Sequence, residues 1–229
     1  MLDSIIAAEV KDGDAGDYAV RFFTSGEVCF HADEVWEFGL YEEGKTIELG
    51  GVITAILEKR MRQYVLPYST YCRRTEAQIV RRIKDHFSYK NGYSGIWEKY
   101  IDAAAENVIA YLKEEGFAGD EAYAGAFFRS SREKNVSSAM LVRELVNRGV
   151  DRDVAENAAK EAERDDASAC RAALEKKLRT RRIGPGDDGT LCEKDKAALM
   201  RFLASRGFET GLIFRTIDEF DFKNIEERE

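Results

Sequence analysis

The sequence is poor in the residues that interrupt helices and in those that build metal sites or disulfides. Two prolines occur in 229 residues. Because proline breaks the hydrogen-bond ladder of a helix, their scarcity favours long helices. Four cysteines lie far apart without a C-x-x-C pair, and two histidines accompany them. The sequence therefore predicts reduced, mostly buried thiols, with no metal site and no cofactor.

Long apolar runs are also missing. No stretch of about 18 consecutive apolar residues occurs, so the sequence predicts no membrane-spanning helix. The first residues, MLDSIIAAEVKDGD, lack the basic start and long apolar core of a signal peptide. With 34% charged and 44% hydrophobic residues, we expect a soluble, helix-rich, cytoplasmic protein.

Positive charge is scarce at the N-terminal end. Residues 1–50 hold 3 Lys/Arg and 12 Asp/Glu, whereas residues 51–229 hold 32 and 31. The first segment would be repelled by nucleic acid, and the remainder would tolerate it wherever arginines cluster on one face. We expect the acidic segment to shape protein contacts or to shield the rest of the chain.

Strand patterns and helix patterns divide the chain at about residue 50. Residues 4–49 alternate in short strand-like runs, with FFTSGEVCF as a hairpin that turns at Gly26. Nearly everything after it carries helical periodicity, and nine helices are predicted. Thr75 and Gln78 form a capping box, Gly116 ends a helix, and Asp120 and Asp151 are expected to cap the helices that follow them.

An internal repeat relates these helices. LVRELVNRGVD at 141–151 aligns without gaps with LMRFLASRGFE at 199–209, and IVRRI at 79–83 is an earlier copy. The spacing of roughly 60 residues accommodates three short helices. A second echo, AENV at 105–108 against AENA at 155–158, indicates an insertion in the first copy near 88–99.

The predicted fold is mainly α, with three tandem three-helix repeats in an elongated array after a small β unit. We expect an acidic β-rich unit over 1–49, repeats over 50–117, 118–165 and 166–221, and an acidic tail over 222–229. In the second repeat, a stripe of apolar residues should be buried: Tyr123, Ala124, Phe127 and Phe128.

Arginines recur at equivalent repeat positions, opposite the apolar face. Arg81, Arg143 and Arg201 share one such position. Surface charge usually means a solvated helix face. Recurrence along an array would instead create a positive ledge suited to a long partner. Both interpretations stay open, and the candidate contacts are Arg81, Arg82, Arg129, Arg132, Arg143, Arg148, Arg201 and Arg206.

Motifs that would indicate catalysis are weak or missing. GPGDDG at 184–189 satisfies G-x-G-x-x-G, but it follows a helical run instead of a strand and places two aspartates where phosphates would lie. No P-loop, H-E-x-x-H or G-x-S-x-G pattern occurs. Residues 1–50 offer scattered acids and His31 but no nucleophile–base pair. The sequence therefore predicts no enzyme activity.

The run YLKEEGFAGDEAYAGAFFRSSR, followed by LVRELVNRGVD and LMRFLASRGFE, resembles the RecX regulatory proteins of bacteria over about residues 60–220. The resemblance implies a non-enzymatic protein that binds the RecA recombinase, chiefly as its filament on single-stranded DNA. It further implies inhibition of strand exchange, ATP hydrolysis and RecA-stimulated LexA cleavage, and so a role in DNA repair and the SOS response. Two departures from the family pattern are the insertion at 88–99 and the loop at 183–192.

A direct DNA-binding regulator is the alternative. Three-helix units can resemble helix-turn-helix domains, whose second helix enters the major groove. The repeated residues on these helices are few, and the net charge is −8. Steeply salt-dependent, sequence-preferring affinity for duplex DNA would favour this alternative.

Overall fold

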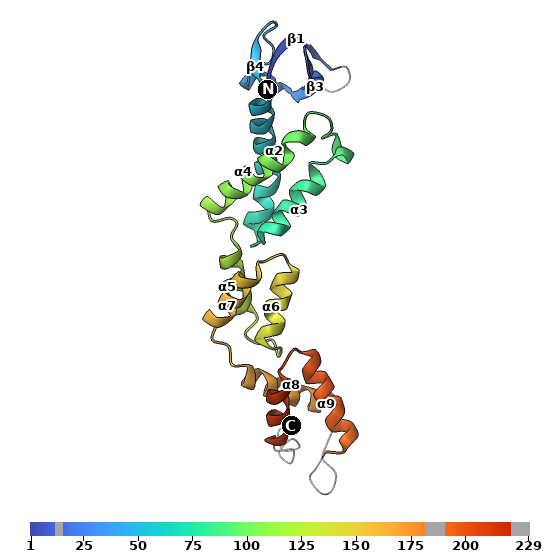
Figure 1. The fold of residues 1–229 in the computed structure, drawn as a ribbon, viewed down its shortest axis with the longest axis vertical. Coiled ribbons are helices and arrows are strands. Elements are labelled where there is room, and N and C mark those ends of the chain that lie inside the picture. Colours follow the sequence, from blue (N-terminus) through green and yellow to red (C-terminus); the bar gives the residue numbers. More distant parts are fainter. Residues whose placement is uncertain (12–15, 182–190, 221–229) are drawn as a thin grey trace. The chain divides into compact units, whose positions relative to one another are not determined.

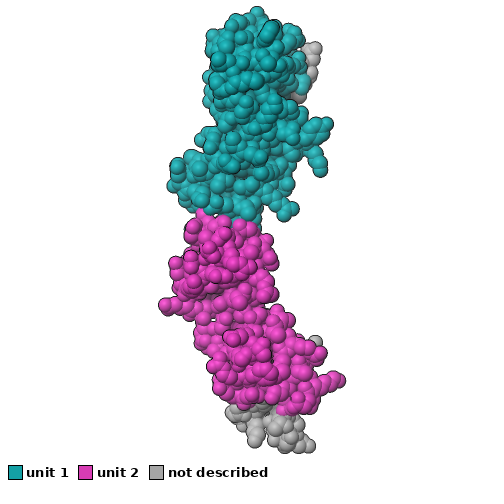
Figure 2. Space-filling view, in the orientation of Figure 1, with its two compact units in different colours: residues 1–118 teal, residues 119–229 magenta. Residues whose placement is uncertain are grey.

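The structure is a computed structural model that describes residues 1–11, 16–181 and 191–220. The chain divides into two compact units, residues 1–118 and 119–229 (Figure 2). It is mainly helical with a small N-terminal sheet, which confirms the predicted class (Figure 1). The arrangement of its helices as tandem repeats in an array stays a prediction, as do the finer boundaries. The GPGDDG loop and the tail at 222–229 lie outside the described residues.

A four-stranded antiparallel sheet begins unit 1. Its strands are β1 (Leu2–Val10), β2 (Asp17–Phe22), β3 (Gly26–His31) and β4 (Thr46–Glu48), in the order β3-β2-β1-β4. The predicted hairpin joins β2 to β3, and Gly26 takes a φ of +74°. Alternate side chains face the interior, because side chains in a strand point to opposite faces. Ile5, Val20, Phe22, Val28 and Phe30 are buried there.

Helices complete unit 1 and share a core with the sheet. Helix α1 (Ala32–Glu37) follows β3, and α2 (Leu49–Tyr71), α3 (Glu76–His86) and α4 (Ile101–Glu114) pack against one another (Figure 1). The segment predicted as an insertion forms two single-turn 3-10 helices, η1 (Tyr89–Asn91) and η2 (Glu98–Tyr100). One continuous apolar cluster runs from the sheet to α4. The small β unit is thus stabilised by the helices that follow it.

The helix ends in unit 1 follow the predicted signals. Thr75 Oγ1 accepts a hydrogen bond from the Gln78 N–H at 3.1 Å, and Gln78 Oε1 accepts one from the Thr75 N–H at 3.3 Å. This is the predicted capping box at the start of α3. Gly116 follows α4 with a φ of +73°, a conformation that glycine adopts without strain.

A largely buried ion pair ties α1 to α2. Arg60 donates from Nε and Nη2 to the Glu34 carboxylate at 2.6 and 2.5 Å, and Glu34 is 2% exposed. The same carboxylate accepts the His31 N–H at 2.9 Å, which caps α1. Burial opposes the charge of Arg60, but Glu34 raises the pKa of Arg60 on balance.

Unit 2 contains six helices among the residues that the structure describes. Helices α5 (Asp120–Ser130), α6 (Ser138–Asn147) and α7 (Arg152–Glu161) share one apolar cluster. Helices α8 (Asp166–Arg181), α9 (Glu193–Ser205) and α10 (Thr210–Asp218) share another. The predicted stripe on α5 is buried at three positions, Ala124, Phe127 and Phe128, while Tyr123 is half-buried.

Two local predictions need correction. Asp151 caps α7 as predicted, but Asp120 does not cap α5. Gly119 holds the capping position at a φ of +151°, a conformation that favours glycine, so Asp120 becomes the first helical residue. The prediction of mostly buried thiols is also wrong, because Cys170 is buried while Cys72 and Cys192 are exposed. Within the described residues, no helix is long and apolar enough to cross a bilayer.

Candidate functional site

The three arginines at the shared repeat position have the same relation to their own helices. Arg81, Arg143 and Arg201 lie on α3, α6 and α9, and all three side chains are exposed. Each follows by two positions a fully buried residue of its helix: Ile79, Leu141 and Leu199. Two positions correspond to about 200° around a helix, so each arginine points away from the core that its helix helps to form.

Local contacts of these three side chains are few. Arg81 Nε lies 3.8 Å from Asp85 Oδ2, in an ion pair whose side chains are 84% and 74% exposed. Arg201 Nε donates to the carbonyl oxygen of Ala197 at 3.2 Å. Exposed ion pairs of this kind contribute little to stability. These arginines are therefore available to an external partner at small cost to the fold.

Two other repeat-related arginines are bound within unit 2. Arg148 donates to the Tyr123 hydroxyl at 3.0 Å and to Glu144 Oε1 at 2.5 Å, and its guanidinium lies 4.7 Å from the Phe127 ring centroid. Arg206 donates to the carbonyl oxygen of Asn135 at 3.3 Å. Both are half-buried. These contacts give both residues a packing role, and their contact with a partner stays a prediction.

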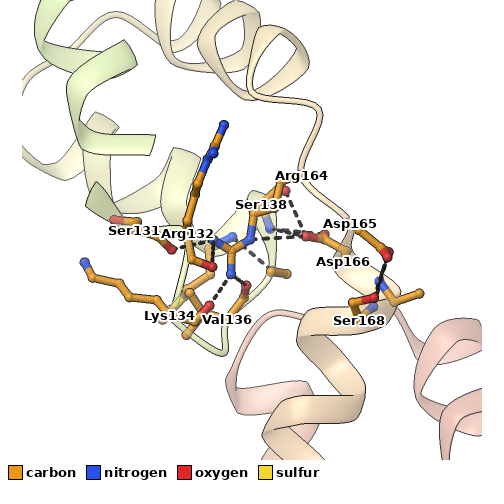
Figure 3. Close-up of polar contacts among 12 residues, drawn as sticks. Ser131, Arg132, Lys134, Val136, Ser138, Arg164, Asp165, Asp166 and Ser168 are labelled. Carbon is orange, nitrogen blue, oxygen red and sulfur yellow. Dashed lines mark hydrogen bonds and ion pairs between the residues drawn. The ribbon is translucent and has the colours of Figure 1, made fainter. Parts of the chain in front are cut away.

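Arg129 and Arg132 lie at the rim of a hollow in unit 2. The hollow has a volume of about 490 Å³, and Phe128 and alanines from α7 and α8 line it together with three acidic residues, Glu161, Glu163 and Asp165. Both arginines are exposed. Figure 3 shows the Arg132 side chain directed away from the neighbouring Arg164. The mixed charge of the lining gives the hollow no clear preference for a ligand of one sign.

Arg164 forms a polar brace between the two helical clusters of unit 2 (Figure 3). Its side chain is 8% exposed. The guanidinium donates to the carbonyl oxygens of Ser131 at 2.5 Å and Val136 at 3.1 Å, and also to that of Lys134. Burial lowers the pKa of Arg164, although Asp166 favours its charged form. Arg164, two residues before the start of α8, thus holds the loop between α5 and α6.

Asp166 completes this brace. Its carboxylate accepts the Ser138 N–H at 2.9 and 3.1 Å and the Ser138 hydroxyl at 2.8 Å. An acidic group at the start of a helix satisfies free N–H groups and is favoured by the helix dipole. Asp166, the first residue of α8, therefore supports the start of α6. Sequence reasoning missed this brace, because its partners lie about 30 residues apart in the chain.

Arg82 lies in a different setting, over two rings of α2. Its Cζ atom is 4.9 Å from the Tyr64 centroid and 4.5 Å from the Tyr68 centroid. Among the described residues, no group of three or more His, Cys, Asp or Glu side chains could hold a metal ion. The candidate residues are thus hydrogen-bond donors and cations on helix surfaces, a chemistry that suits anionic or carbonyl-rich partners.

Comparisons with known proteins agree with the sequence resemblance. No protein-family model matches the chain. The regulatory protein RecX of Escherichia coli (strain K12 / DH10B) is 31% identical over 137 residues, which cover 58% of this chain and 75% of that relative. The regulatory protein RecX of Shigella boydii serotype 18 matches equally.

Two solved structures share the fold. A crystal structure of a regulatory protein RecX superposes with a TM-score of 0.59 at 17% identity, over 95% of this chain and 100% of that one. The crystal structure of RecX from Lactobacillus salivarius gives a TM-score of 0.54 at 20% identity, over 73% and 98%. The fold is therefore shared with the first structure over nearly the whole chain and with the second over about three quarters of it.

Proposed function

The chain belongs to the RecX family of regulatory proteins, and from that membership we propose that it binds the RecA recombinase and regulates it. The proposed target is chiefly the RecA filament on single-stranded DNA. Binding would restrain ATP hydrolysis, strand exchange and RecA-stimulated LexA cleavage, and so modulate DNA repair and the SOS response. The protein would act in the cytoplasm as a binding partner and not as an enzyme.

The observation that supports this proposal beyond family membership is the common placement of Arg81, Arg143 and Arg201. Each projects from the second helix of a predicted three-helix repeat, on the side opposite that helix's buried residues. A filament repeats its own surface at regular intervals, so a protein with repeated cations offers it repeated contacts. We propose these three arginines as the main contacts, with Arg129 and Arg132 beside them.

The direct test is the DNA-dependent ATPase of RecA from the same organism. Purified full-length protein, added up to a stoichiometric ratio, should lower the steady-state rate of ATP hydrolysis and should co-sediment with RecA filaments. Unchanged ATPase and strand exchange at that ratio would refute the proposed regulation.

Charge reversal tests the proposed contacts separately from the function. The triple variant R81E/R143E/R201E should weaken inhibition at least tenfold while its circular dichroism spectrum stays helical, because the three side chains have few internal contacts. The matched control is R21E/R152E/R171E, which reverses three exposed arginines at unrelated positions. If both triple variants inhibit RecA equally, Arg81, Arg143 and Arg201 are ordinary solvated surface residues and not contacts with RecA.

The same assays address the direct DNA-binding alternative. If RecA activity does not change and the protein instead shows sequence-preferring affinity for duplex DNA that falls steeply with salt, the regulator acts on DNA itself.

A further inference from the structure

One segment of unit 1 has a charge opposite to that of the chain as a whole. Residues 60–90 contain eight Lys/Arg and two Asp/Glu, in a chain whose net charge is −8. The segment covers the C-terminal half of α2 and all of α3. Such a local excess of positive charge attracts anionic partners even when the whole molecule is acidic.

Aromatic rings and guanidinium groups alternate on this surface. Tyr64 and Tyr68 lie one turn apart on α2, and Arg82 lies over both rings at 4.9 and 4.5 Å. Arg74 lies over Tyr68 at 4.3 Å, and His86 stacks on Tyr64 at 3.9 Å with the ring planes 14° apart. These five side chains form a continuous series of contacts, called here the Tyr–Arg stack.

The arginines of this surface differ from most cations in unit 1, because no carboxylate of the described residues pairs with Arg73, Arg74 or Arg82. By contrast, Arg62, on the same helix as the two tyrosines, lies 3.6 Å from Glu58. Arg74 Nε is buried and has no hydrogen-bond partner. A guanidinium in cation–π contact with a ring still has N–H groups for an acceptor, so the stack presents cationic donors that no carboxylate neutralises.

An exposed ring adjoins the Tyr–Arg stack. Tyr71 ends α2, three residues after Tyr68, and it is 88% exposed. Side chains three apart on a helix are neighbours, so this free aromatic face lies on the side of α2 that carries Tyr68. Single-stranded nucleic acids bind surfaces that combine cationic groups with free aromatic faces. Their phosphates contact the cations and their bases stack on the rings. An acidic peptide would use the cations alone.

We propose that the Tyr–Arg stack, together with Arg73 and Tyr71, is a binding site for single-stranded nucleic acid. The terminal N–H groups of Arg74 and Arg82 donate to neighbouring backbone phosphates, Arg73 adds an exposed positive charge, and a base stacks on Tyr71. The site has no base-edge readers, so binding is insensitive to sequence. It needs only this chain and the nucleic acid, and is therefore independent of the regulation of RecA proposed above.

The test uses the full-length protein alone, without RecA. Fluorescence anisotropy of a labelled oligothymidylate of about 20 nucleotides, over a series of salt concentrations, gives the affinity and its salt dependence. Arg74→Ala/Arg82→Ala should lower the affinity at least tenfold, and should reduce the slope of log affinity against log salt by about 1.4, since each phosphate contact on a single strand contributes about 0.7.

The matched control is Arg21→Ala/Arg62→Ala. It removes the same charge from unit 1, but it takes arginines that face carboxylates, Glu27 at 3.9 Å and Glu58 at 3.6 Å. The control should bind like the original protein. If both double variants lose affinity equally, binding follows net charge and the proposed site is wrong. Arg73→Ala, in the turn between α2 and α3, gives a second variant that leaves the Tyr–Arg stack in place and should lose one phosphate contact.

Substitution of Tyr71 separates stacking from charge. Tyr71→Ala should weaken binding about tenfold at an unchanged salt slope, whereas Tyr71→Phe should preserve it, because base stacking needs the ring and not the hydroxyl. Polyglutamate of matched charge is the competitor. Competition as strong as that of the oligonucleotide would identify a site for acidic peptides and overturn the proposal, as would the lack of oligonucleotide binding at low salt. If the protein fails this test but still inhibits RecA, the proposed nucleic-acid site is wrong and the proposed regulation of RecA stands.

Discussion

In each unit, one of the described arginines is largely buried, Arg60 in unit 1 and Arg164 in unit 2, and the two have different hydrogen-bond partners. In unit 1, Arg60 meets a single carboxylate, that of Glu34, in a two-point ion pair. In unit 2, Arg164 donates to carbonyl oxygens of the backbone. The partner of Arg60 can be changed by substitution, whereas the partners of Arg164 cannot. The first interaction is therefore a replaceable side-chain pair, whereas the second uses backbone groups that every variant keeps.

The sizes of the apolar cores give a reason to expect that unit 2 depends on such a brace. The cluster in unit 1 contains 24 buried residues, against nine in each cluster of unit 2, within the described residues. Small cores bury less apolar surface and leave less free energy to offset the ordering of the chain. The Arg164 brace joins the two small clusters by hydrogen bonds, which adds order where apolar burial is limited.

The largest expected effect is at Arg164. Arg164→Met should lower the free energy of unfolding of unit 2 by about 4 kcal/mol, because it leaves the carbonyl oxygens of the α5–α6 loop and the Asp166 carboxylate without their cation. Both tryptophans, Trp36 and Trp97, lie in unit 1. Urea unfolding by circular dichroism should therefore shift to lower urea, while the tryptophan fluorescence transition stays in place.

Arg132→Ala is the control for this experiment. Arg132 is exposed and its side chain points away from the brace (Figure 3), so its loss should change stability by less than about 0.5 kcal/mol. If Arg164→Met leaves the circular dichroism transition within that margin of the original, the brace adds nothing and the contrast between the two arginines fails.

The replaceable pair in unit 1 gives a smaller effect that can be reversed. Arg60→Met should destabilise unit 1 by about 3 kcal/mol, because Glu34 is then buried without its cation. Adding Glu34→Gln removes the stranded charge and keeps an oxygen for the His31 N–H, so the double variant should recover at least half of the loss. The measurement is urea unfolding followed by tryptophan fluorescence. A double variant no more stable than Arg60→Met would show that the charge of Glu34 is not the source of the loss.

Local signals in the sequence were enough to predict several of the helix ends. The capping box of Thr75 and Gln78 and the cap at Asp151 each involve residues at most three positions apart, so their pattern could be recognised directly. The prediction that Asp120 caps α5 is wrong for a local reason too. The preceding Gly119 adopts a positive φ that favours glycine and takes the capping position itself. Periodicity likewise placed the arginines of the shared repeat position on the exposed side of their helices.

Interactions between distant segments could not be predicted in this way. Arg60 and Glu34 are 26 residues apart, and Arg164 reaches carbonyls 28 to 33 residues away. Helical periodicity identifies which face of a helix is buried, but it does not say which polar side chain is enclosed by another segment. For the same reason, the sequence offered both Arg143 and Arg148 as candidate contacts, and the hydrogen bonds of Arg148 to Tyr123 and Glu144 could not be predicted.

The smallest expected effect concerns a buried carboxylate, the counterpart of Arg164 in unit 1. Asp3 is 2% exposed and accepts the backbone N–H groups of Thr24 at 3.0 Å and Ser25 at 2.8 Å. Burial alone would raise the pKa of Asp3, but the Ser25 side chain and the backbone N–H groups of Thr24, Ser4 and Ser25 outweigh it and lower that pKa in the folded chain. A carboxyl group whose folded pKa lies below its unfolded value of about 3.9 stabilises the fold above that value, and the stabilisation is lost as the pH falls through the folded pKa.

Asp3→Asn should therefore lower the free energy of unfolding of unit 1 by about 1 kcal/mol at pH 7, since the amide oxygen replaces one acceptor and the charge is lost. Below pH of about 4 the difference from the original protein should shrink, because Asp3 is then protonated in the unfolded chain and, below its lowered pKa, in the folded chain as well. Tryptophan fluorescence in urea at neutral and acid pH measures both values, and Asp102→Asn, which alters an exposed ion pair with Lys84, is the control. A difference that stays constant into acid would mean that the geometry of the turn at 24–25, and not the charge of Asp3, stabilises the sheet. The backbone-bound charge of unit 1 would then differ in kind from that of Arg164.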